Sequence, residues 1–139
     1  MPEARRRTAG WKSLGNFLVF VHGKEAPSDV EWDELLALFR AVPDITRARV
    51  LVFTLGGAPD ARQRAKLHQL LGETKPPIAV LTPSALARAA GTAISWFNPR
   101  LRVFDPDDVE RALDHLDAVR ADRQALIHAM GDLRREMHV

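Results

Sequence analysis

The sequence contains neither cysteine nor tyrosine among its 139 residues. Without cysteine there is no disulfide framework, no cysteine-ligated zinc site and no thiol nucleophile. Long apolar runs are missing too, and no segment approaches the roughly 20 apolar residues that span a bilayer. The basic start, with arginine at positions 5–7, is not followed by an apolar stretch, unlike a secretory signal. We therefore expect a cytoplasmic protein without a membrane span.

An excess of charge of one sign is also lacking, since 20 basic and 18 acidic residues leave a net charge of only +2. Two basic clusters stand out, at positions 5–7 and at Arg62, Arg64 and Lys66. Such clusters bind nucleic acid in some proteins but are more often solvated surface, so nucleic-acid binding is not expected. The length and a hydrophobic share of 46% suit one domain with its own core.

Four short apolar runs, at 17–21, 50–55, 78–81 and 101–104, predict four strands. The first three are apolar without alternation, which is typical of parallel strands covered on both faces. In the fourth, Arg102 separates Leu101 from Val103, which indicates an edge strand. Residues 10–14 could add a short antiparallel edge strand, with Trp11 covering the core.

Helical patterns lie between these runs. The spacing of Ser28 and Glu31 predicts a capping box, and an apolar stripe follows until Pro43. A second helix is expected over 61–72, with leucines 67, 70 and 71 facing inward. Thr82 is expected to cap a third helix with Pro83 in its first turn. Its sheet-facing side is predicted to comprise Leu86, Ala89, Ala90, Ala93, Ile94 and Phe97.

The C-terminal part predicts further helix. Asp105 is expected to cap it and Pro106 to begin it. The helix would run from about 107 to near the end, with a break around 120–123. Its apolar positions are Leu116, Val119, Leu126, Met130, Leu133 and Met137. This stripe either folds back on the domain or pairs with a second copy of the chain.

Together these patterns predict an α/β single domain: a mostly parallel sheet of four or five strands, helices on both faces and a C-terminal helical extension. The expected division is a basic extension at 1–13, the α/β domain at 14–119 and the C-terminal helix at 120–139. Common enzymatic signatures are absent, including the phosphate-binding loop, the dinucleotide fingerprint and the GxSxG elbow. The five histidines show no HxxxH or HExxH pairing, so we expect no enzyme, metal or cofactor.

Polar residues that follow the predicted strands are the candidate site, because carboxyl ends of parallel strands meet at one edge of a sheet, where ligands and partners bind. They are Thr54, Gly56, Gly57, Asp60, Arg62 and Arg64 after the second run, Thr82, Ser84 and Arg88 after the third, and His22 and Lys24 after the first. Ordinary turns, helix caps and solvated arginines account for the same residues without any function. The candidates for a catalytic nucleophile or base are few: His22, Asp60, Thr82 and Ser84.

A family resemblance rests on four stretches: 50–54 with the turn after it, 79–82, the alanine-rich third helix, and 103–113 with its Phe-Asp-x-x-x-x-Glu-x-Ala-Leu pattern. Over about residues 14–119 the chain resembles a STAS domain, the SpoIIAA-like fold of anti-sigma-factor antagonists. The resemblance implies a non-catalytic regulatory module of bacterial signal transduction that binds partner proteins.

The resemblance also implies a phosphorylated serine in the loop after a central strand. The matching stretch here, residues 55–61, contains neither serine nor threonine, and Thr54 lies just before it. We therefore expect the interaction surface without the phosphorylation switch, with Asp60 as a possible permanent charge. The alternative function is a small-molecule or nucleotide-binding module that uses the strand-end cleft near Gly56, Gly57 and Thr82.

Overall fold

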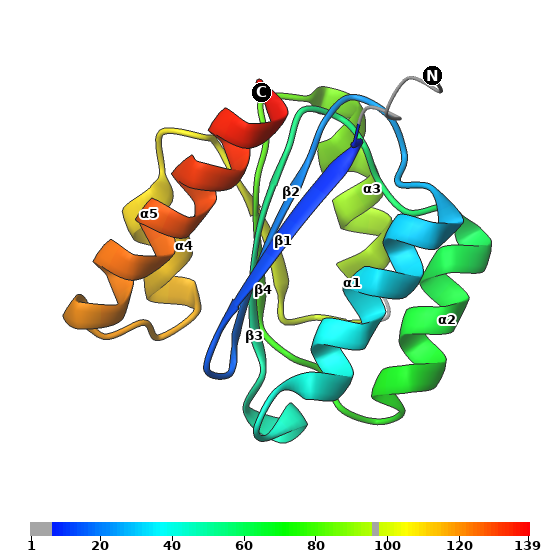
Figure 1. Ribbon diagram of the computed structural model, residues 1–139, viewed down its shortest axis with the longest axis horizontal. Helices are drawn as coiled ribbons and strands as arrows, with labels where there is room; N and C mark the ends of the chain where they lie inside the picture. Colours follow the sequence, from blue (N-terminus) through cyan, green and yellow to red (C-terminus); the bar gives the residue numbers. More distant parts are fainter. Residues whose placement is uncertain (1–6, 96–97) are drawn as a thin grey trace, which may run out of the picture.

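A five-stranded sheet forms the centre of the molecule (Figure 1). The structure is a computed structural model and describes residues 7–95 and 98–139. The strands follow chain order across the sheet; β2 to β5 are parallel, and β1 pairs antiparallel with β2. They are β1 (Ala9–Leu14), β2 (Phe17–His22), β3 (Arg49–Thr54), β4 (Ile78–Leu81) and β5 (Leu101–Phe104). The four predicted strands and the short antiparallel edge strand are thus confirmed.

Helices cover both faces of this sheet, as predicted. One face carries α1 (Asp29–Ala41), α2 (Ala61–Leu71) and α3 (Ala85–Ser95), and the other carries α4 (Val109–His115) and α5 (Arg120–Met137) (Figure 1). A short 3-10 turn, η1 (Ile45–Arg47), precedes β3. Each of the four parallel strands therefore contributes alternate side chains to two separate cores.

The β1–β2 hairpin and the start of α1 are tied together by Glu31. A tight turn containing Gly15 at φ 61° joins the two strands. Ser28 and Glu31 form the predicted capping box, and the Glu31 carboxylate also accepts hydrogen bonds from the backbone N–H and the hydroxyl of Thr8, at 2.9 and 2.6 Å. Burial raises the pKa of Glu31, but the hydrogen bonds from Thr8 and Ser28 outweigh it and lower the pKa below its usual value.

Two details of α3 differ from the prediction. Ser84 rather than Thr82 caps the helix: the Ser84 hydroxyl accepts the backbone N–H of Ala87 at 3.1 Å, so Pro83 lies before the helix. The predicted sheet-facing side is also wrong in part, because Leu86 is 77% exposed and Ala89 and Ala93 are exposed.

The residues of α3 that face the sheet are Ala87, Ala90, Gly91 and Ile94. Gly91 explains this rotation, since a Cβ at its position would lie 2.6 Å from a methyl of Val103 on β5. The helix turns its smallest residue toward the edge strand, which leaves Leu86 in solvent. Phe97 lies outside the described residues.

The C-terminal helices also begin and break elsewhere than expected. Residues 105–108 form a turn, so Asp105 and Pro106 precede α4 rather than start it. The break falls at 116–119, where Asp117 adopts φ 52°, and Val119 is 63% exposed rather than part of the stripe. Arg123, expected at the break, lies within α5 and binds the carboxylates of Glu110 and Asp114 at 2.9 and 2.6 Å.

The remaining apolar stripe of α5 is buried within the same chain. Leu126, Met130 and Leu133 belong to the core on the α4–α5 side of the sheet. Gly10 of β1 permits this approach, since a Cβ there would lie 3.0 Å from the Met137 sulfur. The C-terminal helix therefore folds back over β1 and β2, which was one of the two expected arrangements.

Candidate functional site

The carboxyl ends of β3 and β4 meet at one edge of the sheet, as predicted. The Thr82 hydroxyl, fully buried, donates a hydrogen bond of 2.7 Å to the carbonyl of Thr54. The same hydroxyl accepts the backbone N–H of Ser84 at 3.1 Å. Thr82 thus fastens one strand end to the next.

The loop after β3 owes its shape to Thr54 and two glycines. The Thr54 hydroxyl accepts the N–H of Gly56 at 3.0 Å and donates to the carbonyl of Gly57 at 2.6 Å. Gly56 has a φ of 142°, which favours glycine. A Cβ at Gly57 would lie 2.2 Å from the carbonyl oxygen of Glu25, so this position also requires glycine.

The backbone N–H groups of both glycines are already used. Gly56 donates to Thr54, and Gly57 donates to the carbonyl of Gly23 at 2.9 Å. A loop that cradles phosphate needs such N–H groups free to point at the ligand. The two glycines therefore serve the turn and its close approach to the β2 loop, and the geometry disfavours a nucleotide phosphate there.

The charged residues of the candidate site have separate structural partners. Asp60 forms a capping box with Gln63 at the start of α2. Arg64 donates to the carbonyl of Pro59 at 2.9 Å, and Arg88 pairs with Asp105 beyond β5. Arg62 is the most loosely held of these, with an Asp29 oxygen at 4.0 Å and a side chain that is 75% exposed.

The four candidate catalytic residues are not brought together. Within the described part of the chain, no side-chain hydrogen bond joins His22, Asp60 and Ser84 to one another. Thr82 contacts Ser84 only through a backbone N–H, and both hydroxyls serve the turn and the helix cap. A nucleophile with a base in hydrogen-bond reach is therefore not formed by these residues.

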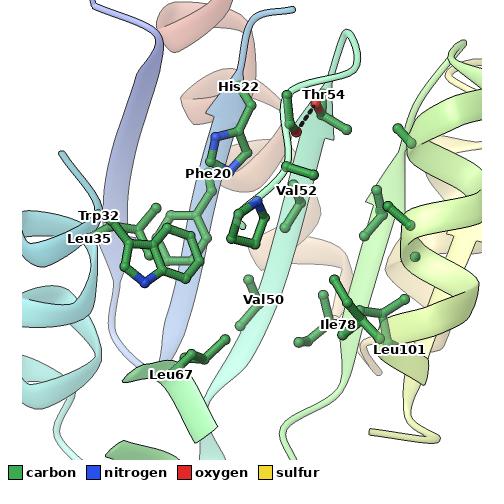
Figure 2. A pocket seen from close by; sticks show the side chains of 18 of the residues that line it. Phe20, His22, Trp32, Leu35, Val50, Val52, Thr54, Leu67, Ile78 and Leu101 are labelled. Carbon is green, nitrogen blue, oxygen red and sulfur yellow. Dashed lines mark hydrogen bonds between the residues drawn. The ribbon is translucent and has the colours of Figure 1, made fainter. Parts of the chain in front are cut away.

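A cavity of about 100 Å³ lies between the sheet and the helices α1, α2 and α3 (Figure 2). Of the residues expected at a strand-end cleft, Gly57 lines it but Gly56 and Thr82 do not, and most of its wall lies deeper between sheet and helices than the sequence predicted. Its walls are almost wholly apolar: Phe20 and Val50 from the strands and Trp32 from α1 contribute large surfaces. The Trp32 indole N–H points away to the carbonyl of Gln63, at 2.9 Å, so it adds no polar group to the cavity. At its upper end in Figure 2 the lining changes to His22 and Thr54.

His22 reaches the cavity because of strand alternation. Leu18, Phe20 and His22 lie on the same face of β2, and His22 is the register partner of Thr54 on β3. In a strand that continues to residue 22, side chains alternate between the two faces, so the sequence could have placed His22 on the face of Leu18 and Phe20. The sequence alone did not reveal the empty volume beside His22. The apolar face of the sheet thus ends in polar side chains at its carboxyl edge.

The imidazole of His22 is 4% exposed and electrostatically unusual. Burial lowers its pKa to about 4, although the negative charge of Glu31 acts in the opposite direction. The ring is therefore neutral at pH 7. Its Nδ1 atom is buried and has no hydrogen-bond partner.

Two other kinds of site, a metal centre and a membrane-spanning helix, are not seen over residues 7–95 and 98–139. Within that range no three His, Asp or Glu side chains cluster closely enough to hold a metal ion. No helix in the same range has both the length and the apolar character needed to cross a bilayer. Comparison of the chain with protein-family models, curated proteins and solved structures finds no match.

Proposed function

We propose that the chain is a non-catalytic regulatory module of STAS-like, SpoIIAA-like type that binds a partner protein in the bacterial cytoplasm. The surface assigned to the partner is the loop after β3, the start of α2 and the adjoining start of α3. We call these residues, 55–64 and 83–89, the strand-end surface.

The observation that carries this proposal is what the strand-end surface presents to solvent. The hydroxyls of Thr54, Thr82 and Ser84 are all engaged in turns and caps. The outward side chains include Leu86, 77% exposed, and the loosely held Arg62. An exposed leucine among alanines on a rigid helix suits the apolar centre of a protein contact, and a peripheral arginine suits its rim.

The rigidity of the surface supports the same proposal. Gly57 binds the β2 loop through Gly23, and Thr82 binds β3 through Thr54. Arg88 links the start of α3 to Asp105 after β5. A surface held by these connections loses little conformational freedom when a partner binds, which favours affinity.

The homodimer through the C-terminal helix stays a prediction. The apolar stripe that suggested it is buried against the sheet of its own chain, so a second copy is not needed to cover Leu126 or Leu133. We therefore assign the partner to the strand-end surface.

The experiment compares two exposed apolar residues that lie near opposite ends of the parallel strands. Leu86→Asp changes the strand-end surface, and Val119→Asp changes an exposed residue beside the start of α5. We expect wild type and Val119→Asp to capture the same protein from the native extract and Leu86→Asp to lose it. Binding measured with that protein in purified form should repeat the difference.

Arg62→Glu should weaken the same complex less than Leu86→Asp does, because a charge at the rim of an interface mainly affects the association rate. Arg64 is a poorer choice, because its bond to Pro59 shapes the loop itself. Equal binding by wild type and a correctly folded Leu86→Asp would contradict the assignment of this surface.

A further inference from the structure

We propose that the cavity beneath α1, α2 and α3 is a binding site for a small uncharged molecule with an apolar body and one hydroxyl group, which hydrogen-bonds to Nδ1 of His22. Phenol is the simplest molecule of this class. The site lies beneath the strand-end surface, whose residues Gly57, Ala58, Pro59 and Ala87 form part of its lining, whereas Leu86 and Arg62 do not line it.

The size and the lining of the cavity limit what it can hold. A dry cavity of about 150 Å³ lined by apolar side chains binds benzene or xenon. The cavity here is about 100 Å³, and Phe20, Val52 and Ile78 give it a comparable lining. Only a compact molecule of about one ring, with modest widening, fits this space.

His22, which lines one end of the cavity, has an unpartnered nitrogen. A buried polar atom without a hydrogen bond is costly, and most such atoms in proteins find a partner. Nδ1 of His22 has none. Thr54, the other polar side chain at this end, already donates to Gly57 and accepts from Gly56.

A single water is a poor occupant of this position. A buried water typically needs two to four polar partners. Apart from His22 and Thr54 the cavity wall is almost wholly apolar, and Phe20 and Val52 are among the residues that line it. A hydroxyl on an apolar body satisfies the nitrogen and fills the remaining volume at the same time.

The charges around the cavity exclude an anionic ligand. No cationic side chain lines the cavity among the described residues, so a carboxylate or phosphate would be buried without a counter-charge. The imidazole is neutral at pH 7, and a phenolic hydroxyl is also un-ionised there. The ligand is therefore neutral, which separates it from the nucleotide considered from the sequence.

The experiment is a titration of the full chain with phenol, followed by calorimetry and by the amide NMR spectrum, with benzene as the matched probe without a hydroxyl. We expect saturable binding, with the largest spectral changes in β2, β3 and α3. Phenol should bind about fivefold more tightly than benzene, the ratio expected for one net hydrogen bond. Lack of saturable phenol binding, or no preference over benzene, overturns the proposal.

Two neighbouring alanines on α3 provide the variants. Ala90→Leu fills the cavity, whereas Ala89→Leu adds the same side chain in solvent. We expect the first to abolish phenol binding and the second to retain it. If Ala90→Leu does not fold, Val80→Ile fills less of the space and should weaken binding measurably; wild-type affinity in a folded filling variant contradicts the site.

His22→Phe tests the hydrogen bond separately. The variant keeps an aromatic ring of similar size but removes the nitrogen, so phenol and benzene should then bind equally. A phenol preference that survives in His22→Phe contradicts the role of His22. Because binding of phenol does not require a protein at the strand-end surface, Leu86→Asp should bind phenol normally, and the two proposals can fail independently.

Discussion

The two faces of the sheet use the same four parallel strands but are packed differently. On the α4–α5 face, Leu51, Leu81 and Leu113 have no exposed surface. On the α1–α3 face, the alternate residues Phe20, Val52 and Val80 border a cavity. One face is filled by long apolar residues of α4 and α5, whereas the other is covered partly by the small residues of α3.

This difference separates two roles of burial. Tight packing contributes most of the stability per residue, and removing even one methylene group lowers the free energy of unfolding. Spare volume reduces stability but leaves room for a ligand. The comparison therefore predicts that equivalent substitutions will have different, and in one case opposite, effects on the two faces.

The largest difference is expected for truncated leucines. Leu126→Ala on the packed face should cost about 3 to 4 kcal/mol of unfolding free energy, near the middle of the range for buried leucines. Leu67→Ala, at the half-buried cavity wall, should cost about 1 to 2 kcal/mol because less surface is lost. Urea unfolding followed by circular dichroism measures both, and equal costs would remove the distinction between the faces.

Acid should destabilise the cavity face specifically through His22. The folded-state pKa of about 4 lies below the usual 6.5, so stability is complete above pH 6.5 and falls between pH 6.5 and 4 as the unfolded chain takes up a proton. The full loss corresponds to about 3 kcal/mol. Urea midpoints across this pH range should fall for wild type and much less for His22→Phe; parallel profiles would show that His22 is not buried in its neutral form.

Added methyl groups should change the free energy of unfolding in opposite directions on the two faces. Ala112→Val, at a residue with no exposed surface in α4, should cost about 1 to 3 kcal/mol through overpacking. Ala90→Val, which enters the cavity, should be neutral or should stabilise by up to about 1 kcal/mol. Thermal unfolding of the two variants provides the measurement, and a similar cost for both would indicate that the cavity cannot accept the added atoms.

The smallest effect is expected from the ion pair that joins α5 to β1. Lys12 and Asp132 lie 3.5 Å apart, with side chains 37% and 43% exposed. Such pairs are screened by water and salt. Lys12→Met should leave the urea midpoint almost unchanged, which would show that α5 is held by Leu126, Met130 and Leu133 rather than by charge.

The sequence predicted the elements well where local signals agreed. Continuous apolar runs located the parallel strands, and Ser28 with Glu31 marked the start of α1. It failed where a tertiary contact decided between similar choices. Thr82 and Ser84 are both residue types that cap helices well. The Thr82 hydroxyl is engaged with the carbonyl of Thr54 on β3, and Ser84 caps α3 instead.

The candidate site was predictable in position but not in form. Strand ends of a parallel sheet had to meet, so Thr54, Gly56 and Thr82 lie at one edge. The cavity could not be read from the sequence, because it depends on the rotation of α3 around Gly91 and on volumes summed over many side chains. The same rotation exposes Leu86, so the close approach of Gly91 to Val103 bears on both unpredicted features.

The position of α5 over the first two strands has a consequence during synthesis. Val19 and Val21 of β2 leave the ribosome long before Leu126 and Leu133, which cover the same face. A nascent chain with all five strands complete therefore still presents an apolar surface near its beginning. Exposed surface of this kind favours aggregation until it is covered. We therefore expect the nascent chain to remain prone to aggregation until α5 has emerged and covers this surface.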